Sequence, residues 1–242
     1  MAINCKGKTD IGQRRETNQD YFRIEELSEN LLLMVVCDGM GGAVGGSEAS
    51  SIATNGFVDY VKENIDNVTH YGELMLCALK KANDDVCDKA QSTSGLEGMG
   101  TTLVAAIYDG EKYTCVWIGD SRIYALTDDG LLQISHDHSY VQTLIDSGNI
   151  TQEEAKIHPN RNIITKAVGT DRTLEGDVCV MDAEKINGLL LCSDGLCGYV
   201  EEKAIESVCS NEQDTEKCVE KLVQMANDAG GPDNITVIVH RK

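Results

Sequence analysis

Short apolar runs that end at glycine-containing turns dominate the middle of this sequence. Between residues 101 and 135, β-branched and aromatic runs alternate with Asp-Gly and Gly-Asp turn signals. This alternation is typical of strands joined by tight turns. It predicts an antiparallel meander with strands at 101–108, 112–118, 122–127 and 131–134. Similar runs predict further strands at 21–25, 31–37, 177–181, 189–192 and 235–240.

Helical patterns occur in pairs between these strand clusters. Apolar residues recur at helical spacing over 47–65 and 73–90, and again over 200–209 and 215–229. Asp214 is a suitable N-cap for the last helix, and Gly230 is a suitable stop. The pattern favours an α/β (α+β) chain in which an antiparallel β-sandwich carries helices on its outer faces. It leaves the order of the layers open.

The segment from 137 to 173 is less regular. It predicts a short helix at 139–147 closed by Gly148, and a second helix opened by a capping box of Thr151 and Glu154. Excursions of this length are often lids or binding loops. No Pro/Ser-rich linker divides the sequence, so we expect one domain over 1–242, with a flap subdomain at about 137–173.

Charge argues against one large class of partners. The chain has 40 acidic and 21 basic residues, for a formal net charge of −19. Nucleic-acid binding requires clustered Lys and Arg, so DNA and RNA are poor candidates. Most of the carboxylates are expected to form a solvated surface.

The sequence also favours a cytoplasmic protein. The first ten residues lack the apolar stretch of a secretory signal, and the longest apolar run, 31–37, is far shorter than a membrane span. Ten cysteines are present without a CxxC pair. We therefore expect reduced thiols that pack as small apolar side chains, and no membrane association.

Four aspartates stand apart from this acidic background because each lies where an apolar strand ends or begins. Asp38, Asp120 and Asp194 follow apolar runs, and Asp233 precedes one. An Asp beside a glycine is by itself an ordinary turn residue. Strands distant in sequence can, however, bring their ends together at one end of a sandwich. The joint pattern therefore suggests one carboxylate cluster.

Such a cluster requires a counter-charge, because four crowded carboxylates repel one another. Oxygen ligands without His or Cys favour Mg²⁺ or Mn²⁺. Two such ions can activate a water and stabilise a phosphoryl transition state. A phosphate substrate would also call for an arginine, and the polar stretch 12–20 supplies Arg15 next to a fifth carboxylate, Asp20. In isolation that stretch reads as a solvated loop.

Six motifs follow one another along the chain: Gly12-x-x-Arg15-x-x-Asn18-Gln19-Asp20, Asp38-Gly39-Met40-Gly41-Gly42, Gly100-Thr101-Thr102, Gly119-Asp120-Ser121-Arg122, Ser193-Asp194-Gly195-Leu196 and Gly231-x-Asp233-Asn234. In this order they resemble the PP2C-type (PPM) family of metal-dependent protein Ser/Thr phosphatases, and most closely its compact bacterial members. The resemblance covers nearly the whole chain. It implies a central β-sandwich flanked by helices on both faces, with a mobile flap that helps to select substrates.

The resemblance also implies roles for the carboxylates. Asp38 would bridge two metal ions, with the Gly39 carbonyl on the first ion and Asp194 and Asp233 on the second. Asp20 would support the second ion, often through water. A third, weaker ion would lie between Asp120 and Asp194.

The remaining roles follow from the same resemblance. Arg15 would bind the substrate phosphate while a metal-bound hydroxide attacks phosphorus directly. Asn234 would orient Asp233 or cap its turn. Many eukaryotic members carry His where this chain has Met40, which leaves the general acid open, with a metal-bound water as one candidate. We expect His138 and His158 to be exposed loop histidines.

The sequence thus predicts an enzyme that hydrolyses phosphoserine and phosphothreonine in proteins. We expect a monomer that opposes a Ser/Thr kinase in a bacterial cytoplasm. Two alternatives remain open: a phosphoesterase for small molecules, and a catalytically silent sensor module on the same fold. The presence of Arg15 with Asp38, Asp194 and Asp233 argues against the silent module.

Overall fold

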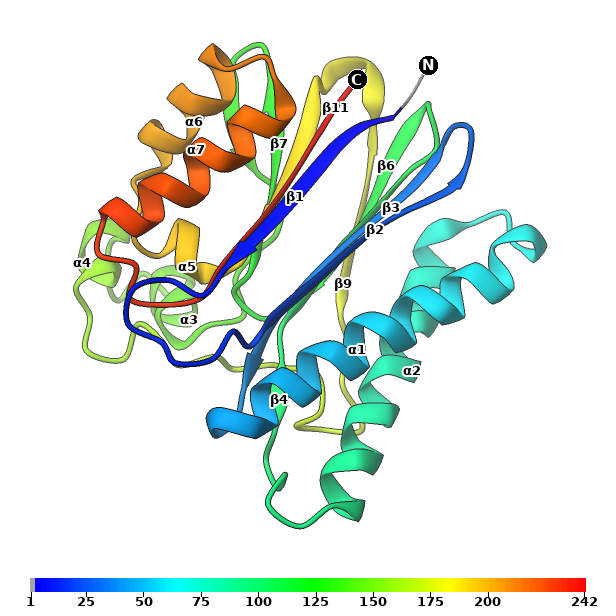
Figure 1. The fold of residues 1–242 in the computed structure, drawn as a ribbon, viewed down its shortest axis with the longest axis vertical. Coiled ribbons are helices and arrows are strands. Elements are labelled where there is room, and N and C mark those ends of the chain that lie inside the picture. Colours follow the sequence, from blue (N-terminus) through cyan, green and yellow to red (C-terminus); the bar gives the residue numbers. More distant parts are fainter. Residues whose placement is uncertain (1–2) are drawn as a thin grey trace.

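Two antiparallel β-sheets, packed face to face, form the body of the computed structural model, which describes residues 3–242 (Figure 1). In spatial order, the first sheet contains β1 (Asn4–Asp10), β11 (Ile235–Arg241), β10 (Gly188–Cys192), β7 (Arg122–Thr127) and β8 (Gly130–Gln133). The second sheet contains β2 (Asp20–Ser28), β3 (Leu31–Met40), β5 (Leu103–Tyr108), β6 (Lys112–Ile118) and β9 (Asp177–Asp182), and the short β4 (Gly100–Thr101) pairs with β3.

Strand β3 shows why the central strands read as continuous apolar runs. Leu32, Met34 and Val36 point into the core between the two sheets. Leu33 and Val35, one residue out of phase, point into a second core beneath helices. Because successive side chains in a strand alternate between faces, a strand buried on both faces must be apolar throughout.

Helices cover both outer faces of the sandwich (Figure 1). Helices α1 (Gly42–Asn64) and α2 (Tyr71–Ser92) pack on the sheet that contains β3. Helices α5 (Asp194–Cys197), α6 (Glu202–Asn211) and α7 (Thr215–Asp228) pack on the sheet that contains β10. Single 3₁₀ turns occur at Ile65–Asn67 and Ala183–Lys185. The predicted sandwich with flanking helix pairs is confirmed, and its layers are now resolved.

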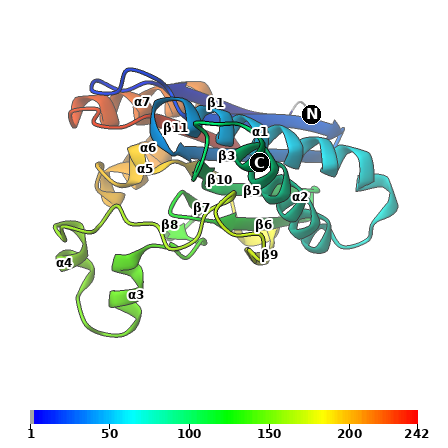
Figure 2. The same cartoon turned by 90° about the horizontal axis from the view of Figure 1, so that it is seen from below.

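The caps predicted from the sequence are present. The Asp214 side chain accepts hydrogen bonds from the first backbone N–H groups of α7, and Gly230 follows that helix with a φ of +110°. Thr151 and Glu154 form the capping box of α4 (Gln152–Lys156), and Ser139 caps α3 (Tyr140–Asp146). Helices α3 and α4 lie in the connection from β8 to β9, which projects from the body (Figure 2).

The predicted meander is wrong at one point. Strand β6 belongs to one sheet and β7 to the other, so the chain crosses between the sheets at residues 119–121. Gly119, with a φ of +98°, allows this change of direction. The predicted strand at 101–108 is also interrupted, at Thr102. Local alternation identifies strands but does not say which sheet each one joins, and this explains the error.

Three further elements differ from the prediction. Strand β1 was not predicted because its burial alternates between exposed and half-buried and its sequence, NCKGKTD, is polar. The single turn of α5, which directly follows Ser193, was not predicted. Helix α1 begins at Gly42 rather than residue 47; the low helix propensity of its glycine-rich first turn explains why this part was not predicted.

Two expectations about composition can also be compared with the structure. All ten cysteines are free thiols, and six of them are buried. No helix in the described part of the chain is long and apolar enough to cross a membrane.

A buried histidine gives the fold a defined pH dependence. His240 in β11 is 2% exposed, and its Nδ1 lies 2.9 Å from the Tyr113 hydroxyl. Burial, with a smaller contribution from Lys242, lowers the pKa of His240 to about 4. Between pH 6.5 and 4 the unfolded chain therefore binds a proton that the folded chain does not, and stability falls as pH falls.

We expect His240→Asn, which keeps an acceptor for Tyr113, to weaken this dependence. In chelator, the free energy of unfolding of the wild type should fall by roughly 2–3 kcal/mol more than that of the variant between pH 7 and 4. Urea denaturation at several pH values measures the difference. The exposed His70→Asn is the matched control and should follow the wild type. Parallel curves for wild type and His240→Asn would rule out His240 as the source.

Candidate metal and phosphate site

Strand ends gather the predicted carboxylates at one end of the sandwich. Four of them line a single cleft of about 480 Å³ together with Arg15; they are Asp38, Asp120, Asp194 and Asp233. Asp38 lies near the end of β3, Asp120 and Asp194 follow β6 and β10, and Asp233 precedes β11. The structure therefore brings together residues that are separated by up to 195 positions in the sequence.

The fifth carboxylate, Asp20, lies beneath the cleft. It begins β2, directly opposite Asp38 in the β2–β3 ladder, and is 6% exposed. Its Oδ2 accepts a hydrogen bond from Ser193 Oγ at 2.7 Å. Its Oδ1 is buried without a hydrogen-bond partner, as is Oδ1 of Asp194. Unpartnered buried oxygens are rare in proteins and mark places where a ligand belongs.

Burial, and after it the neighbouring carboxylates, raises the pKa values of four of these aspartates. Burial, opposed by hydrogen bonds from Ser193 and Thr236, raises the pKa of Asp20 to about 7. Burial and the charge of Asp233 raise that of Asp194 to about 6. Burial and neighbouring carboxylates raise the pKa values of Asp38 and Asp120 well above the ordinary range. Arg15 alone does not balance these carboxylates, and a divalent cation would supply the missing positive charge.

The donor set fits a hard cation. All five side chains offer carboxylate oxygens, which suit Mg²⁺ and Mn²⁺. Nevertheless, within residues 3–242 no three acidic, histidine or cysteine side chains are already arranged as an ion-binding group. One reason is that Asp233 Oδ2 accepts a hydrogen bond from Arg15 Nη2 at 2.7 Å. Mutual repulsion also favours separation of the carboxylates when no cation is between them.

Asn234 holds the loop that carries Arg15. Its Oδ1 accepts a hydrogen bond from Gln19 N at 2.8 Å, and its Nδ2 donates to Ile11 O and Thr17 O at 2.9 and 3.0 Å. Its contact with Asp233 is through the backbone, because Asn234 N donates to Asp233 Oδ1 at 2.9 Å. The Asn234 side chain therefore fixes the 11–19 loop rather than the Asp233 carboxylate.

Two hydroxyls that the sequence interpretation missed connect Asp38 with the Asp120 loop. Thr102 Oγ1 accepts a hydrogen bond from Asp38 N at 3.0 Å and lies 2.7 Å from Ser121 Oγ. Both hydroxyls belong to motifs that were recognised, Gly100-Thr101-Thr102 and Gly119-Asp120-Ser121-Arg122. What the motifs did not indicate is that the strand is interrupted at Thr102, between β4 and β5, where this hydroxyl meets Ser121.

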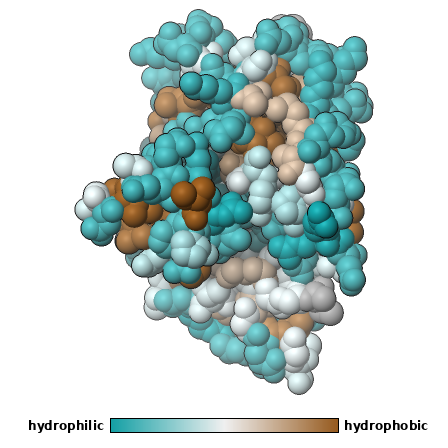
Figure 3. Space-filling view, turned by 90° about the vertical axis from the view of Figure 1, so that its left-hand side faces the viewer, coloured by the Kyte–Doolittle hydropathy of each residue, from teal (hydrophilic) through white to brown (hydrophobic). Residues whose placement is uncertain are grey.

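The projecting lobe of residues 137–173 forms one wall of the cleft through Asn162 and Ile164. Figure 3 shows this lobe at the left, with apolar patches among hydrophilic surface. His138, at its root, is 8% exposed, so the prediction of an exposed loop histidine is wrong there. Its ring is enclosed between the Gly119 backbone and Asp177. His158 is half-buried, with Nδ1 accepting from Asn160 N.

Close backbone contacts give a sharp stability test. A Cβ atom at Gly195 would lie 1.8 Å from Asn234 O, so Gly195→Ala must separate α5 from the segment before β11, both of which carry predicted site residues. We expect a loss of roughly 3 kcal/mol or more in thermal or urea unfolding. Gly56→Ala in α1 is the control: its Cβ would meet the end of the flexible Asp85 side chain at 3.1 Å and Ala82 Cα at an ordinary 3.9 Å, so it should be neutral or slightly stabilising. Equal behaviour of the two variants would contradict the close approach.

Comparisons with known proteins agree with this geometry. Residues 9–238 match the family model described as Protein phosphatase 2C. The chain is 35% identical to "Serine/threonine phosphatase stp" of Listeria welshimeri, covering 98% of this chain and 95% of the relative. It is 36% identical to "Protein phosphatase PhpP" of Streptococcus pneumoniae, covering 95% and 93%.

Solved structures give the same result. The Ser/Thr phosphatase Stp1 of Staphylococcus aureus superposes with a TM-score of 0.91 at 34% identity, covering 100% of this chain and 96% of that one. The catalytic domain of PstP, solved in complex with two manganese ions, superposes at 0.85 with 31% identity, covering 99% and 97%. The chain therefore belongs to the protein phosphatase 2C family and is a metal-dependent protein serine/threonine phosphatase.

Proposed function

We propose that this phosphatase binds two divalent ions, Mn²⁺ or Mg²⁺, through Asp38, Asp194 and Asp233 with the Gly39 carbonyl. The observation that carries the proposal is the convergence of these carboxylates in one cleft, with unpartnered oxygens on Asp194 and on Asp20 beneath it. Asp20 supports the ions from behind, held by Ser193. Asp120, with Asp194, forms a third and weaker site.

The chain's own residues bind and orient the substrate. When bound, the ions supply charge neutralisation and activation of the attacking water. Arg15 offers a planar guanidinium at the cleft, half exposed and able to hold two phosphate oxygens at once. Arg15 is paired with Asp233 in this structure, and its guanidinium would be free to bind phosphate once the Asp233 carboxylate served as a metal ligand. Asn234 keeps the Arg15 loop in place during this exchange.

Water is the group that protonates the leaving alkoxide. Met40 lines the cleft where many family members have histidine, and no histidine is among the described residues that line it. His138 is engaged at both ring nitrogens. Water at the cleft is then the remaining proton source.

We further propose the setting of the enzyme. Its substrates are phosphorylated proteins, among them a Ser/Thr kinase that it opposes, in a bacterial cytoplasm. Ten free thiols are consistent with a reducing compartment. The chain forms one domain over 1–242 with residues 137–173 as a flap, and it acts as a monomer.

The metal centre is tested by Asp38→Asn. The wild type should hydrolyse a phosphothreonine peptide with Mn²⁺ and stop in chelator, and the variant should lose roughly 100-fold or more in kcat because both ions lose a ligand. Asp129→Asn, at an exposed turn, is the matched control and should keep full activity. Full activity of Asp38→Asn, or activity in chelator, would falsify the metal mechanism.

The phosphate-binding role is tested by Arg15→Lys, with the exposed neighbour Arg14→Lys as control. Loss of the planar fork should lower kcat/KM for the phosphopeptide by roughly 10–100-fold, with Mn²⁺ affinity by calorimetry near that of the wild type. Arg14→Lys should change neither quantity. Equal kinetics for the two variants would remove Arg15 from the site.

Comparing the rates of hydrolysis of nucleotides and of the phosphopeptide in the same assay separates a protein phosphatase from a small-molecule phosphoesterase.

A further inference from the structure

The Asp120 loop depends on neighbours for its position. Residues 119–121 form the crossover from β6 in one sheet to β7 in the other, so no strand ladder continues through them. Asp120 is nevertheless only 9% exposed and faces the cleft. Its buried carboxylate is repelled by Asp194, and something must oppose its displacement. Asp137 and His138 are consecutive residues at the root of the projecting lobe. His138 contacts Gly119, which precedes Asp120, and Asp137 contacts Arg122, which follows the crossover.

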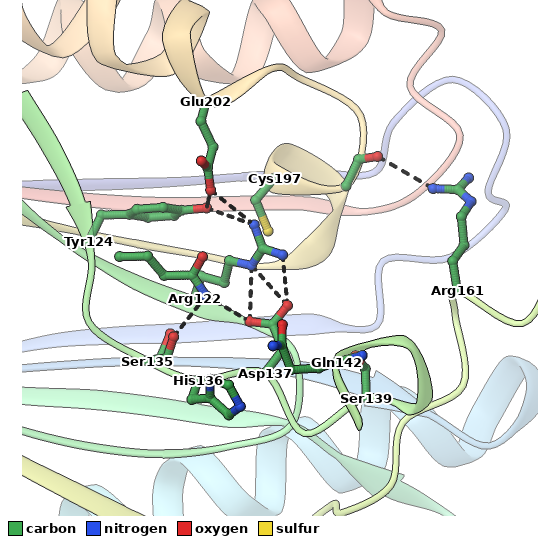
Figure 4. A network of polar contacts seen from close by, with 12 residues as sticks. Arg122, Tyr124, Ser135, His136, Asp137, Ser139, Gln142, Arg161, Cys197 and Glu202 are labelled. Atoms are coloured by element: carbon green, nitrogen blue, oxygen red, sulfur yellow. Dashed lines mark hydrogen bonds and ion pairs between the residues drawn. The ribbon is translucent and has the colours of Figure 1, made fainter. Parts of the chain in front are cut away.

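Asp137 holds the residue that follows the crossover. Arg122 Nε donates to both carboxylate oxygens of Asp137 at 3.0 Å, and Arg122 Nη2 donates to Oδ2 at 2.7 Å (Figure 4). Gln133 Nε2 adds a fourth hydrogen bond, to Oδ1, at 3.0 Å. Asp137 is 8% exposed, so this ion pair lies largely out of water, where its geometry is stiff.

His138 holds the residue that precedes Asp120. Its backbone N donates to Gly119 O at 2.9 Å, and its Nδ1 accepts from Gly119 N at 3.1 Å. Because Gly119 N is a donor, Nδ1 must be unprotonated, and Nε2 carries the proton toward Asp177 Oδ2 at 3.1 Å. Thr165 N donates to His138 O at 2.8 Å, so the segment in which the lobe returns to the body contacts the same residue.

On its other side, the crossover is attached to Asp38, a predicted metal ligand. Ser121 Oγ bonds with Thr102 Oγ1, which in turn accepts from Asp38 N. Asp120 is therefore held between the lobe root on one side and the Asp38 strand on the other. A shift at either side would move its carboxylate relative to Asp38.

We propose that Asp137 and His138 act as a positioning pair. By holding Arg122 and Gly119 they keep the Asp120 carboxylate directed into the cleft, and they thereby couple its position to the root of the lobe. Neither residue touches the reacting atoms. The inference rests on the proposed role of Asp120 in the metal centre. It also implies that lobe movement is confined to the part beyond His138 and before Thr165, because His138 is bonded to Gly119 of the crossover and Thr165 is bonded to His138.

The variants separate positioning from simple structural support. His138→Leu removes the acceptor for Gly119 N, whereas His138→Asn retains an oxygen where Nδ1 stood. Asp137→Asn weakens the second contact. The control is Glu202→Gln, which removes the negative charge of the exposed partner of the same Arg122, 3.3 Å from its Nη1, and leaves the Asp137 contact intact.

We expect His138→Leu and Asp137→Asn to lower kcat by roughly 10–100-fold with both a phosphothreonine peptide and p-nitrophenyl phosphate, with little change in KM. His138→Asn should recover most of the loss, and Glu202→Gln should match the wild type. If only the KM for the peptide rises and p-nitrophenyl phosphate turnover is unchanged, the pair serves the lobe alone and the inference is overturned.

A readout without turnover completes the test. In metal-free protein, hydrogen exchange at residues 119–122 should be at least about tenfold faster in His138→Leu than in the wild type, and near wild-type rates in His138→Asn. In Mn²⁺ calorimetry the weakest ion should be lost from His138→Leu while the tighter ions remain. Unchanged exchange at 119–122 would overturn the positioning pair even if activity falls.

The two proposals fail differently. If Asp120→Asn binds Mn²⁺ and turns over substrate as the wild type does, the role of Asp120 fails, whatever the exchange data show. If Asp120→Asn loses the weakest ion but His138→Leu keeps it, the metal role stands and the positioning pair is wrong. Loss of the weakest ion in both variants, with recovery in His138→Asn, supports both.

Discussion

Repulsion between buried carboxylates at one end of the sandwich is the constraint around which the rest of this structure is arranged. Asp20, Asp38, Asp120 and Asp194 all have raised pKa values, because they are removed from water and lie near one another. Left alone, such a group would move apart or bind protons. The surrounding fold has to hold it together until a cation binds.

The sandwich supplies that rigidity through its apolar interior. Strand β3 is buried on both faces, so the strand that carries Asp38 is fixed by two cores. Asp20 and Asp38 lie within β2 and β3, strands whose positions are set elsewhere by apolar packing. Hydroxyls and amides then fix the loops, as Ser193 does for Asp20 and Asn234 does for the Arg15 loop.

The same reasoning connects the lobe with the chemistry. A loop at the rim of a cleft is usually free to move. The root of the 137–173 lobe, in contrast, is attached by an ion pair and by hydrogen bonds to the crossover that carries Asp120. The crossover, residues 119–121, has two roles. It carries the chain from the sheet of β6 to the sheet of β7, and it presents the Asp120 carboxylate to the cleft; contacts with the lobe root stabilise it in both roles.

Much of the fold could be predicted from local pattern. Helices α2 and α7, the caps at Asp214 and Thr151, and most strands follow from periodicity and from capping chemistry, which act over a few residues. Strand β1 could not be predicted in this way, because its polar sequence is stabilised by pairing with β11 along its whole length. The change of sheet after β6 was missed because alternation does not encode which strands pair.

The sequence by itself determined which residue types were available to the site: aspartates at strand ends, an arginine in a polar loop and no histidine after Gly39. Only the tertiary structure decided how they meet. It brought the carboxylates into one cleft, paired Arg15 with Asp233, and enclosed His138 at the lobe root. The reason is that burial and repulsion depend on distances between segments far apart along the chain, and those distances are set by packing of the two sheets.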